Sequence, residues 1–187
     1  DLFKNILKSD GIRIVDPAMA DNGKLYTGFD TSFVNEMRNL IGFSDIILPN
    51  MTEAGLLTDS EIILENQTDE YIKDIIYKLK ALGAKNIVLK GVKNIEGKLG
   101  IAIYEADTDS IDIFCTDRIK KDAHGTGDCY AAAFTGCLMQ GKSLGEAVKV
   151  AAEFVSEAIL KTVDDDSHWY GVKFERAIPV LVRELDK

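Results

Sequence analysis

The sequence predicts an α/β domain in which helices cover both faces of a mainly parallel sheet. Short β-rich runs at residues 12–15, 45–48 and 86–91 alternate along the chain with amphipathic stretches. These runs are apolar rather than alternating, which is typical of parallel strands buried on both faces. Ligands of such sheets bind beyond the carboxyl ends of the strands, so polar residues at those ends are the first candidates for a site.

The composition fits a single globular domain spanning residues 1–187, with 46% hydrophobic and 28% charged residues. A net charge of -9 without a basic stripe argues against a nucleic-acid partner. The three cysteines lack C-x-x-C spacing and indicate a reducing compartment. Because neither a signal peptide nor an apolar run of about 18 residues is present, we expect a cytoplasmic protein without a membrane span.

Residues 29–41 and 68–82 carry apolar residues at helical spacing, and six stretches in all are expected to form helices. They are residues 29–41, the stretch from 51, 68–82, the stretch from the Gly125 turn to about Gln140, 143–163 and 172–185. Another amphipathic helix is expected at residues 1–9. Gly42, Gly83 and Gly141 end three of the helices, and Pro179 should kink or divide the last one.

Two further strands, at residues 99–105 and 110–116, flank a polar turn and are expected to pair antiparallel. Pro17 and Pro49 close the strands that precede them, because proline cannot continue a ladder. Residues 18–26 are expected to form a loop with Asn-Gly turn chemistry.

Asp16, Asn50, Lys90 and the Gly125 loop all follow strands, so the predicted topology gathers them at one edge of the sheet. Asn50 and Glu53 also have a purely structural explanation, since Asn followed three residues later by Glu matches a helix capping box. Taken alone, that motif leaves function and capping equally open.

The segment His124-Gly125-Thr126-Gly127-Asp128 precedes an alanine-rich run and predicts a helix whose N-terminus binds an anion. A carboxylate would repel a phosphate there, unless it takes the proton from a hydroxyl that attacks the phosphate. The alternative is that Asp128 only complements the helix dipole.

Three motifs in this order, at residues 16–26, 48–54 and 124–128, resemble the pyridoxal kinases of the ribokinase-like superfamily over essentially the whole chain. The resemblance implies transfer of the γ-phosphoryl group of ATP to the 5′-hydroxyl of pyridoxal, pyridoxine or pyridoxamine in vitamin B6 salvage. It also implies Mg²⁺, a monovalent cation (K⁺ or Na⁺) and a homodimer. The family begins with further strands that nothing here matches, so the resemblance predicts that the N-terminal strands are missing and leaves the activity of this chain alone open.

The resemblance also assigns roles to residues. Asp128 corresponds to the catalytic base beside the substrate alcohol, Gly125, Thr126 and Gly127 to the anion hole, and Tyr26 to a neighbour of the B6 ring. The residues it implies at the nucleotide are Asp16, Asn50, Lys90, Gly91, Thr116, Ile119 and Lys121. Those it implies for metal, directly or through water, are Asp16, Asp21 and Glu53.

Two alternatives stay open at this point. A hydroxymethylpyrimidine (phosphate) kinase of the same superfamily is expected to carry Cys where this chain has Asp128, although some kinases accept both substrates. The chain could also be a non-catalytic nucleotide-binding module.

Overall fold

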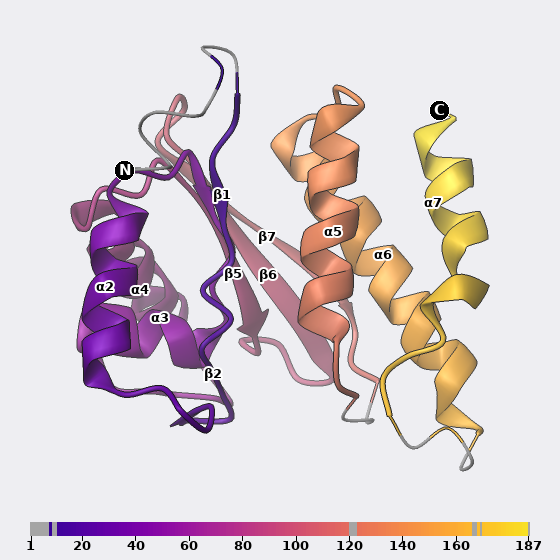
Figure 1. Cartoon of the computed structure of the whole chain (residues 1–187), viewed down its shortest axis with the longest axis horizontal. Helices are drawn as coiled ribbons and strands as arrows, with labels where there is room; N and C mark the ends of the chain where they lie inside the picture. The colour runs from indigo at the N-terminus through magenta and orange to yellow at the C-terminus, as the bar shows by residue number, and fades with distance from the viewer. Residues whose placement is uncertain (1–7, 9–10, 120–122, 166–167, 169, 187) are drawn as a thin grey trace. The chain divides into compact units, whose positions relative to one another are not determined.

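The computed structural model describes residues 8, 11–119, 123–165, 168 and 170–186. The chain divides into two compact units, residues 1–115 and 116–187 (Figure 1). The helix predicted at residues 1–9 lies outside the described residues except for Lys8. Among the described helices, none has the length and apolar character needed to cross a membrane.

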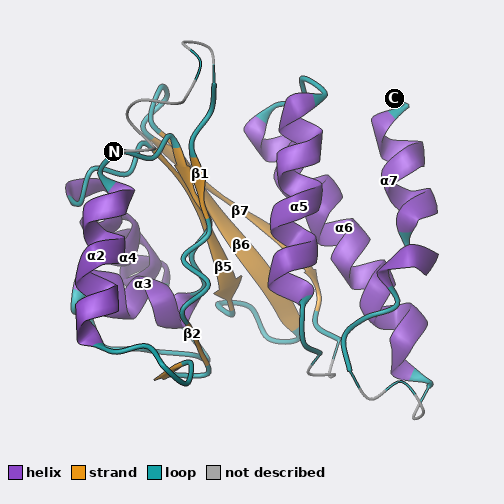
Figure 2. Ribbon diagram, viewed as in Figure 1, coloured by secondary structure: helices purple, strands orange, loops and turns teal. Residues whose placement is uncertain are grey.

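A five-stranded sheet forms the centre of the first unit, and its last strand ends at the start of the second. Its strands, in spatial order, are β1 (Ile14–Val15), β4 (Ile46–Ile47), β5 (Asn86–Val92), β6 (Lys98–Glu105) and β7 (Ser110–Asp117). The first three strands are parallel, whereas β6 pairs antiparallel with β5. Residues 106–109 join β6 to β7 in a turn too short for a parallel crossover, so this pair is antiparallel as predicted. The α/β prediction is confirmed, with a mixed sheet (Figure 2).

The segment predicted as a loop at residues 18–26 contains a hairpin of its own. Strands β2 (Ala20–Asp21) and β3 (Lys24–Leu25) pair antiparallel. Asn22 and Gly23 link them with φ angles of 49° and 78°. Positive φ at both central residues is what a tight turn between twisted strands requires, and Asn-Gly supplies it at little cost.

Three helices lie together on one side of the sheet in the first unit (Figure 2). They are α2 (Thr31–Ile41), α3 (Met51–Thr58) and α4 (Asp69–Ala81). α2 and α4 begin slightly later than predicted, because the side chains of Asp30 and Thr68 cap their first turns from outside. The core between helices and sheet consists of fully buried aliphatic side chains that include Ile47, Ile87 and Leu89 from the strands and Ile41, Leu57, Ile75, Ile76 and Leu79 from the helices.

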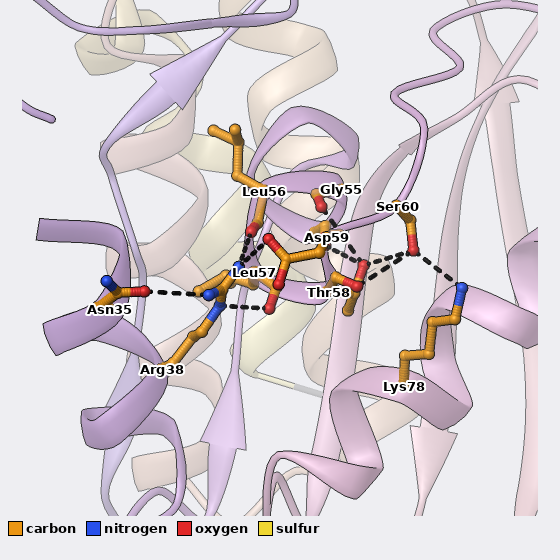
Figure 3. Close-up of polar contacts among 10 residues, drawn as sticks. Asn35, Arg38, Gly55, Leu56, Leu57, Thr58, Asp59, Ser60 and Lys78 are labelled. Carbon is orange, nitrogen blue, oxygen red and sulfur yellow. Dashed lines mark hydrogen bonds and ion pairs between the residues drawn. The ribbon is translucent and has the colours of Figure 1, made fainter. Parts of the chain in front are cut away.

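The end of α3 is held by Arg38, which reaches across from α2 (Figure 3). Its guanidinium donates hydrogen bonds to the carbonyl oxygens of Leu56 (2.6 Å) and Leu57 (2.7 Å). The same group pairs with Asp59 at 2.5 Å and donates to Asn35 at 3.0 Å. The last carbonyls of a helix have no intrahelical partners, so this fork of donors caps α3.

Replacing Arg38 with Met keeps the length of the stem but leaves the two carbonyls of α3 without these donors. We expect a loss of about 1.5–3 kcal/mol in the free energy of unfolding, the range for hydrogen bonds from charged groups. Urea unfolding measures it. Arg183→Met is the matched control, because the Arg183 side chain is largely exposed in its pair with Glu184, and it should change stability by less than about 1 kcal/mol. Equal effects of the two changes would contradict the capping role.

The second unit is helical beyond the end of β7. Its elements are α5 (Thr126–Met139), α6 (Leu144–Val163), the 3-10 turn η1 (Phe174–Arg176) and α7 (Ile178–Leu185). The last predicted helix is divided as expected, with Pro179 in the first turn of α7, where its missing N–H costs nothing. α5 ends at Met139 with Gln140 as its C-cap, one position before the predicted cap at Gly141, which follows with φ of 84°. The prediction of one domain, and of helices over both faces of the sheet, stays a prediction.

Candidate functional site

A pair of opposite charges lies at the carboxyl ends of β1 and β5. The Lys90 ammonium is 3.2 and 3.4 Å from the two carboxylate oxygens of Asp16, which follows β1. Both side chains are mostly buried. Lys90 also forms a parallel bridge with Asn50, and its N–H donates to the carbonyl of Pro49 at 2.8 Å. The structure therefore brings Asp16, Asn50 and Lys90 together at one edge of the sheet, as the topology predicted.

Glu53 is buried beside this pair and completes a capping box. Its carboxylate accepts the N–H of Asn50 at 2.8 Å, and the Asn50 side chain accepts the N–H of Glu53 at 2.9 Å. The other carboxylate oxygen accepts the N–H of Met19 at 2.9 Å. The capping explanation of this motif is thus confirmed. Burial raises the pKa of the Glu53 carboxyl, against the opposing effect of the two N–H donors and of the nearby Lys90 charge.

The three carboxylates predicted to handle metal do not converge. Within the described part of the chain, no three His, Cys, Asp or Glu side chains form a group that could hold a metal ion. Asp21 is exposed and accepts the N–H of Asn22, while both oxygens of Glu53 accept backbone N–H groups. The role of Asp16, Asp21 and Glu53 in handling metal, directly or through water, stays a prediction. Mg²⁺ usually keeps several waters and binds one or two carboxylates plus phosphates, so it does not need three converging carboxylates.

Gly91 and Tyr26 lie on segments that border this edge. Gly91 has φ of 84°, a left-handed backbone conformation that favours glycine. It lies where the register between β5 and β6 shifts. Tyr26 follows the hairpin, and its ring is about half exposed. Its N–H donates to the carbonyl of Met19 at 2.9 Å, which ties the end of the hairpin to its start.

The other predicted nucleotide contacts come after residue 115. Thr116 lies in β7 and is half-buried, and so is Ile119. Lys121 lies outside the described residues. Their roles at the nucleotide stay predictions.

In the second unit, the glycine turn opens α5 as predicted. Gly125 occupies the N-cap position with φ of 77° and offers no side-chain cap, and its carbonyl accepts the N–H of Cys129 at 3.0 Å. A Cβ placed on Gly127 would meet nothing within 4 Å, and Asp128 is exposed in the first turn. An open first turn without a side-chain cap suits an anion. The roles of Thr126 and Asp128 in catalysis stay predictions.

Sequence reasoning missed the partners of two segments. The His124 ring stacks on Tyr170, with ring centroids 5.4 Å apart. In the first unit, the hydrogen bond from the Met19 N–H to Glu53 and the one from the Gly23 N–H to the Thr52 hydroxyl were not predicted. These contacts join residues tens of positions apart, through two rings in the first case and through single backbone groups in the others, so they leave no pattern in the sequence.

Comparison with known proteins gives the class first. A putative phosphomethylpyrimidine kinase from Bacteroides thetaiotaomicron, crystallised with pyridoxal, superposes with a TM-score of 0.89 at 31% identity, over 100% of this chain and 65% of that one. The pyridoxal kinase of Staphylococcus aureus in complex with ADP gives 0.68 at 28% identity, over 79% and 52%. The fold is therefore that of the ribokinase-like kinases.

The family follows from the sequence. Residues 2–172 match the family described as Phosphomethylpyrimidine kinase, and the chain belongs to it. The hydroxymethylpyrimidine/phosphomethylpyrimidine kinase of Staphylococcus aureus (strain Mu50 / ATCC 700699) is 31% identical over 155 residues, 80% of this chain and 53% of that protein. The chain thus spans about half the length of such curated relatives. The resemblance to pyridoxal kinases holds at the level of the superfamily, while this relative favours the pyrimidine kinase that was the alternative.

Proposed function

We propose that the chain belongs to a kinase that transfers the γ-phosphoryl group of ATP to the hydroxymethyl group of a pyrimidine, hydroxymethylpyrimidine or its phosphate. This proposal rests on one observation: in a member of the phosphomethylpyrimidine kinase family, Asp16, Asn50 and Lys90 lie close together at the ends of parallel strands. Ligands of α/β sheets bind at such an edge.

Phosphoryl transfer depends on positioning and on compensation of charge, and it needs little covalent chemistry from the protein. In the proposed mechanism the Lys90 ammonium compensates phosphate charge, and the N–H groups of the first turn of α5 receive the oxygens of the transferred group. Asp128 accepts the hydroxyl proton as the new O–P bond forms and the bond to the β-phosphate oxygen breaks, which releases ADP. Mg²⁺, when bound, neutralises the phosphates, and Asp16 and Glu53 would hold it through water.

Pyridoxal is the second candidate substrate. It presents the same primary alcohol on a nitrogen heteroaromatic ring, so the chemical step is unchanged. Asp128 favours it, because a pyrimidine kinase is expected to carry Cys at this position. The similar Bacteroides thetaiotaomicron structure contains pyridoxal. The monovalent cation, the homodimer and the cytoplasmic location stay predictions.

The test compares the two acceptors on the purified chain with ATP and Mg²⁺. ADP release and the mass of the phosphorylated product are measured for hydroxymethylpyrimidine and for pyridoxal. We expect the higher kcat/KM with hydroxymethylpyrimidine, and a higher value with pyridoxal would select the second candidate. Isothermal titration with ATP covers the remaining case, since nucleotide binding without turnover would indicate a non-catalytic module.

A further inference from the structure

The first turn of α3 bonds to the hairpin β2–β3 as well as to itself. Three of its side chains, here called the clasp, each hydrogen-bond to a different backbone group at residues 19–23. The bonds are Asn50 Nδ2 to the Ala20 carbonyl (2.8 Å), the Gly23 N–H to Thr52 Oγ1 (3.0 Å) and the Met19 N–H to Glu53 Oε1 (2.9 Å).

Helix capping alone does not account for the clasp. α6 shows what a capping box needs, since its Glu146 is exposed and accepts the N–H and the hydroxyl of Ser143 within the box. In α3, by contrast, Thr52 and Glu53 are each 1% exposed. Polar side chains buried to this degree need partners, and the hairpin supplies them.

The hairpin depends on such outside support. Its strands have two residues each, and an isolated two-stranded hairpin is marginal in water. Asp21 and Lys24 are exposed on it, and Tyr26 follows directly after β3. The Tyr26 N–H donates to the Met19 carbonyl at 2.9 Å, so whatever fixes residues 19–23 also fixes the backbone at Tyr26, which the resemblance to pyridoxal kinases sets near the ring of the acceptor.

We propose that Thr52 is a positioning residue for the acceptor substrate, acting through the hairpin that the clasp holds. The effect on the acceptor rests on the proposed function, whereas the hold on the hairpin does not. Loss of the Thr52 bond then loosens the hairpin and the acceptor site and leaves nucleotide affinity unchanged.

Thr52→Val removes one bond of the clasp and keeps the shape of the side chain. Thr58→Val is the matched control, because the Thr58 hydroxyl lies in the same helix and donates to the Ala54 carbonyl at 2.7 Å, inside α3. Hydrogen exchange of the Gly23 amide is followed by NMR. Acceptor affinity is measured by titration and as KM, and ATP affinity by titration.

In Thr52→Val we expect faster exchange at Gly23 and weaker acceptor binding, each by about 3- to 10-fold, the effect of one lost hydrogen bond. ATP affinity should stay unchanged, Thr58→Val should alter neither quantity, and Thr52→Ser should restore both. Unchanged exchange at Gly23, or equal acceleration in Thr58→Val, would overturn the clasp. Faster exchange with unaltered acceptor binding would overturn the positioning role. Absence of turnover would contradict the proposed function alone, because the exchange measurement needs no substrate.

Discussion

Asp128→Asn is expected to lower kcat by about 10²- to 10⁴-fold, the usual contribution of a positioned general base. Asn keeps the size of the side chain but cannot accept the hydroxyl proton. ATP affinity should change little, because the lost interaction belongs to the chemical step. Steady-state kinetics with saturating ATP, together with titration of ATP, measures both quantities.

Glu146→Gln separates catalysis from the helix dipole. Glu146 is exposed in the first turn of α6, as Asp128 is in α5, so each carboxylate complements a helix N-terminus. If Asp128 acts as the base, kcat falls in Asp128→Asn and stays normal in Glu146→Gln. Near-normal turnover of Asp128→Asn would reduce Asp128 to the dipole role.

Most of the helices and strand ends could be predicted because local sequence patterns mark them. Apolar periodicity located α2 and α4, and a capping pattern and a glycine turn located the starts of α3 and α5. Pro17 and Pro49 marked strand ends, and all of these signals depend on neighbours in the sequence. The hairpin at residues 18–26 was not predicted. Its Asn-Gly turn was visible, but strands of two residues are too short for alternation to register.

The candidate site could be predicted as a location but not as a set of contacts. Parallel strands end at the same edge of a sheet, so the proximity of Asp16 and Lys90 followed from topology although 74 positions separate them. Their ion pair depends on register and rotamers, which no motif encodes. Glu53 was expected to handle metal, and only the coordinates reveal that both of its oxygens accept backbone N–H groups.

The substrate is the least predictable part. A glycine turn and an acidic first-turn residue serve phosphoryl transfer to any primary alcohol, so residues 124–128 resemble several kinases at once. Ring recognition, which the resemblance assigns to side chains such as Tyr26, depends on surroundings that tertiary contacts set. The resemblance therefore reached the superfamily and favoured pyridoxal, whereas the curated relative acts on a pyrimidine by its name.

Glu53→Gln is expected to destabilise the fold by about 1–3 kcal/mol, the cost of a buried donor left without a partner. The carboxylate accepts two backbone N–H groups, from Met19 and Asn50. Gln can accept only one of them, and its NH₂ group then faces the other. Urea unfolding at several pH values measures the difference between wild type and variant.

The pH dependence of that difference identifies its cause. Burial raises the pKa of Glu53 above its ordinary value of 4.5, so the folded state binds the proton more tightly than the unfolded state. The difference in free energy of unfolding between the wild type and Glu53→Gln is then largest below pH 4.5, and it shrinks as pH rises through the raised pKa of Glu53. An advantage that grows with pH would mean that the N–H donors and Lys90 outweigh burial.

Glu146→Gln provides a control of opposite sign. The pKa of Glu146 is lowered by hydrogen bonds from the hydroxyl and the N–H of Ser143. Its contribution is therefore present above the ordinary pKa of a glutamate and is lost as pH falls through the lowered value. Opposite pH trends in these two capping-box variants would attribute the behaviour of Glu53 to burial under the hairpin, because the local box is common to both helices.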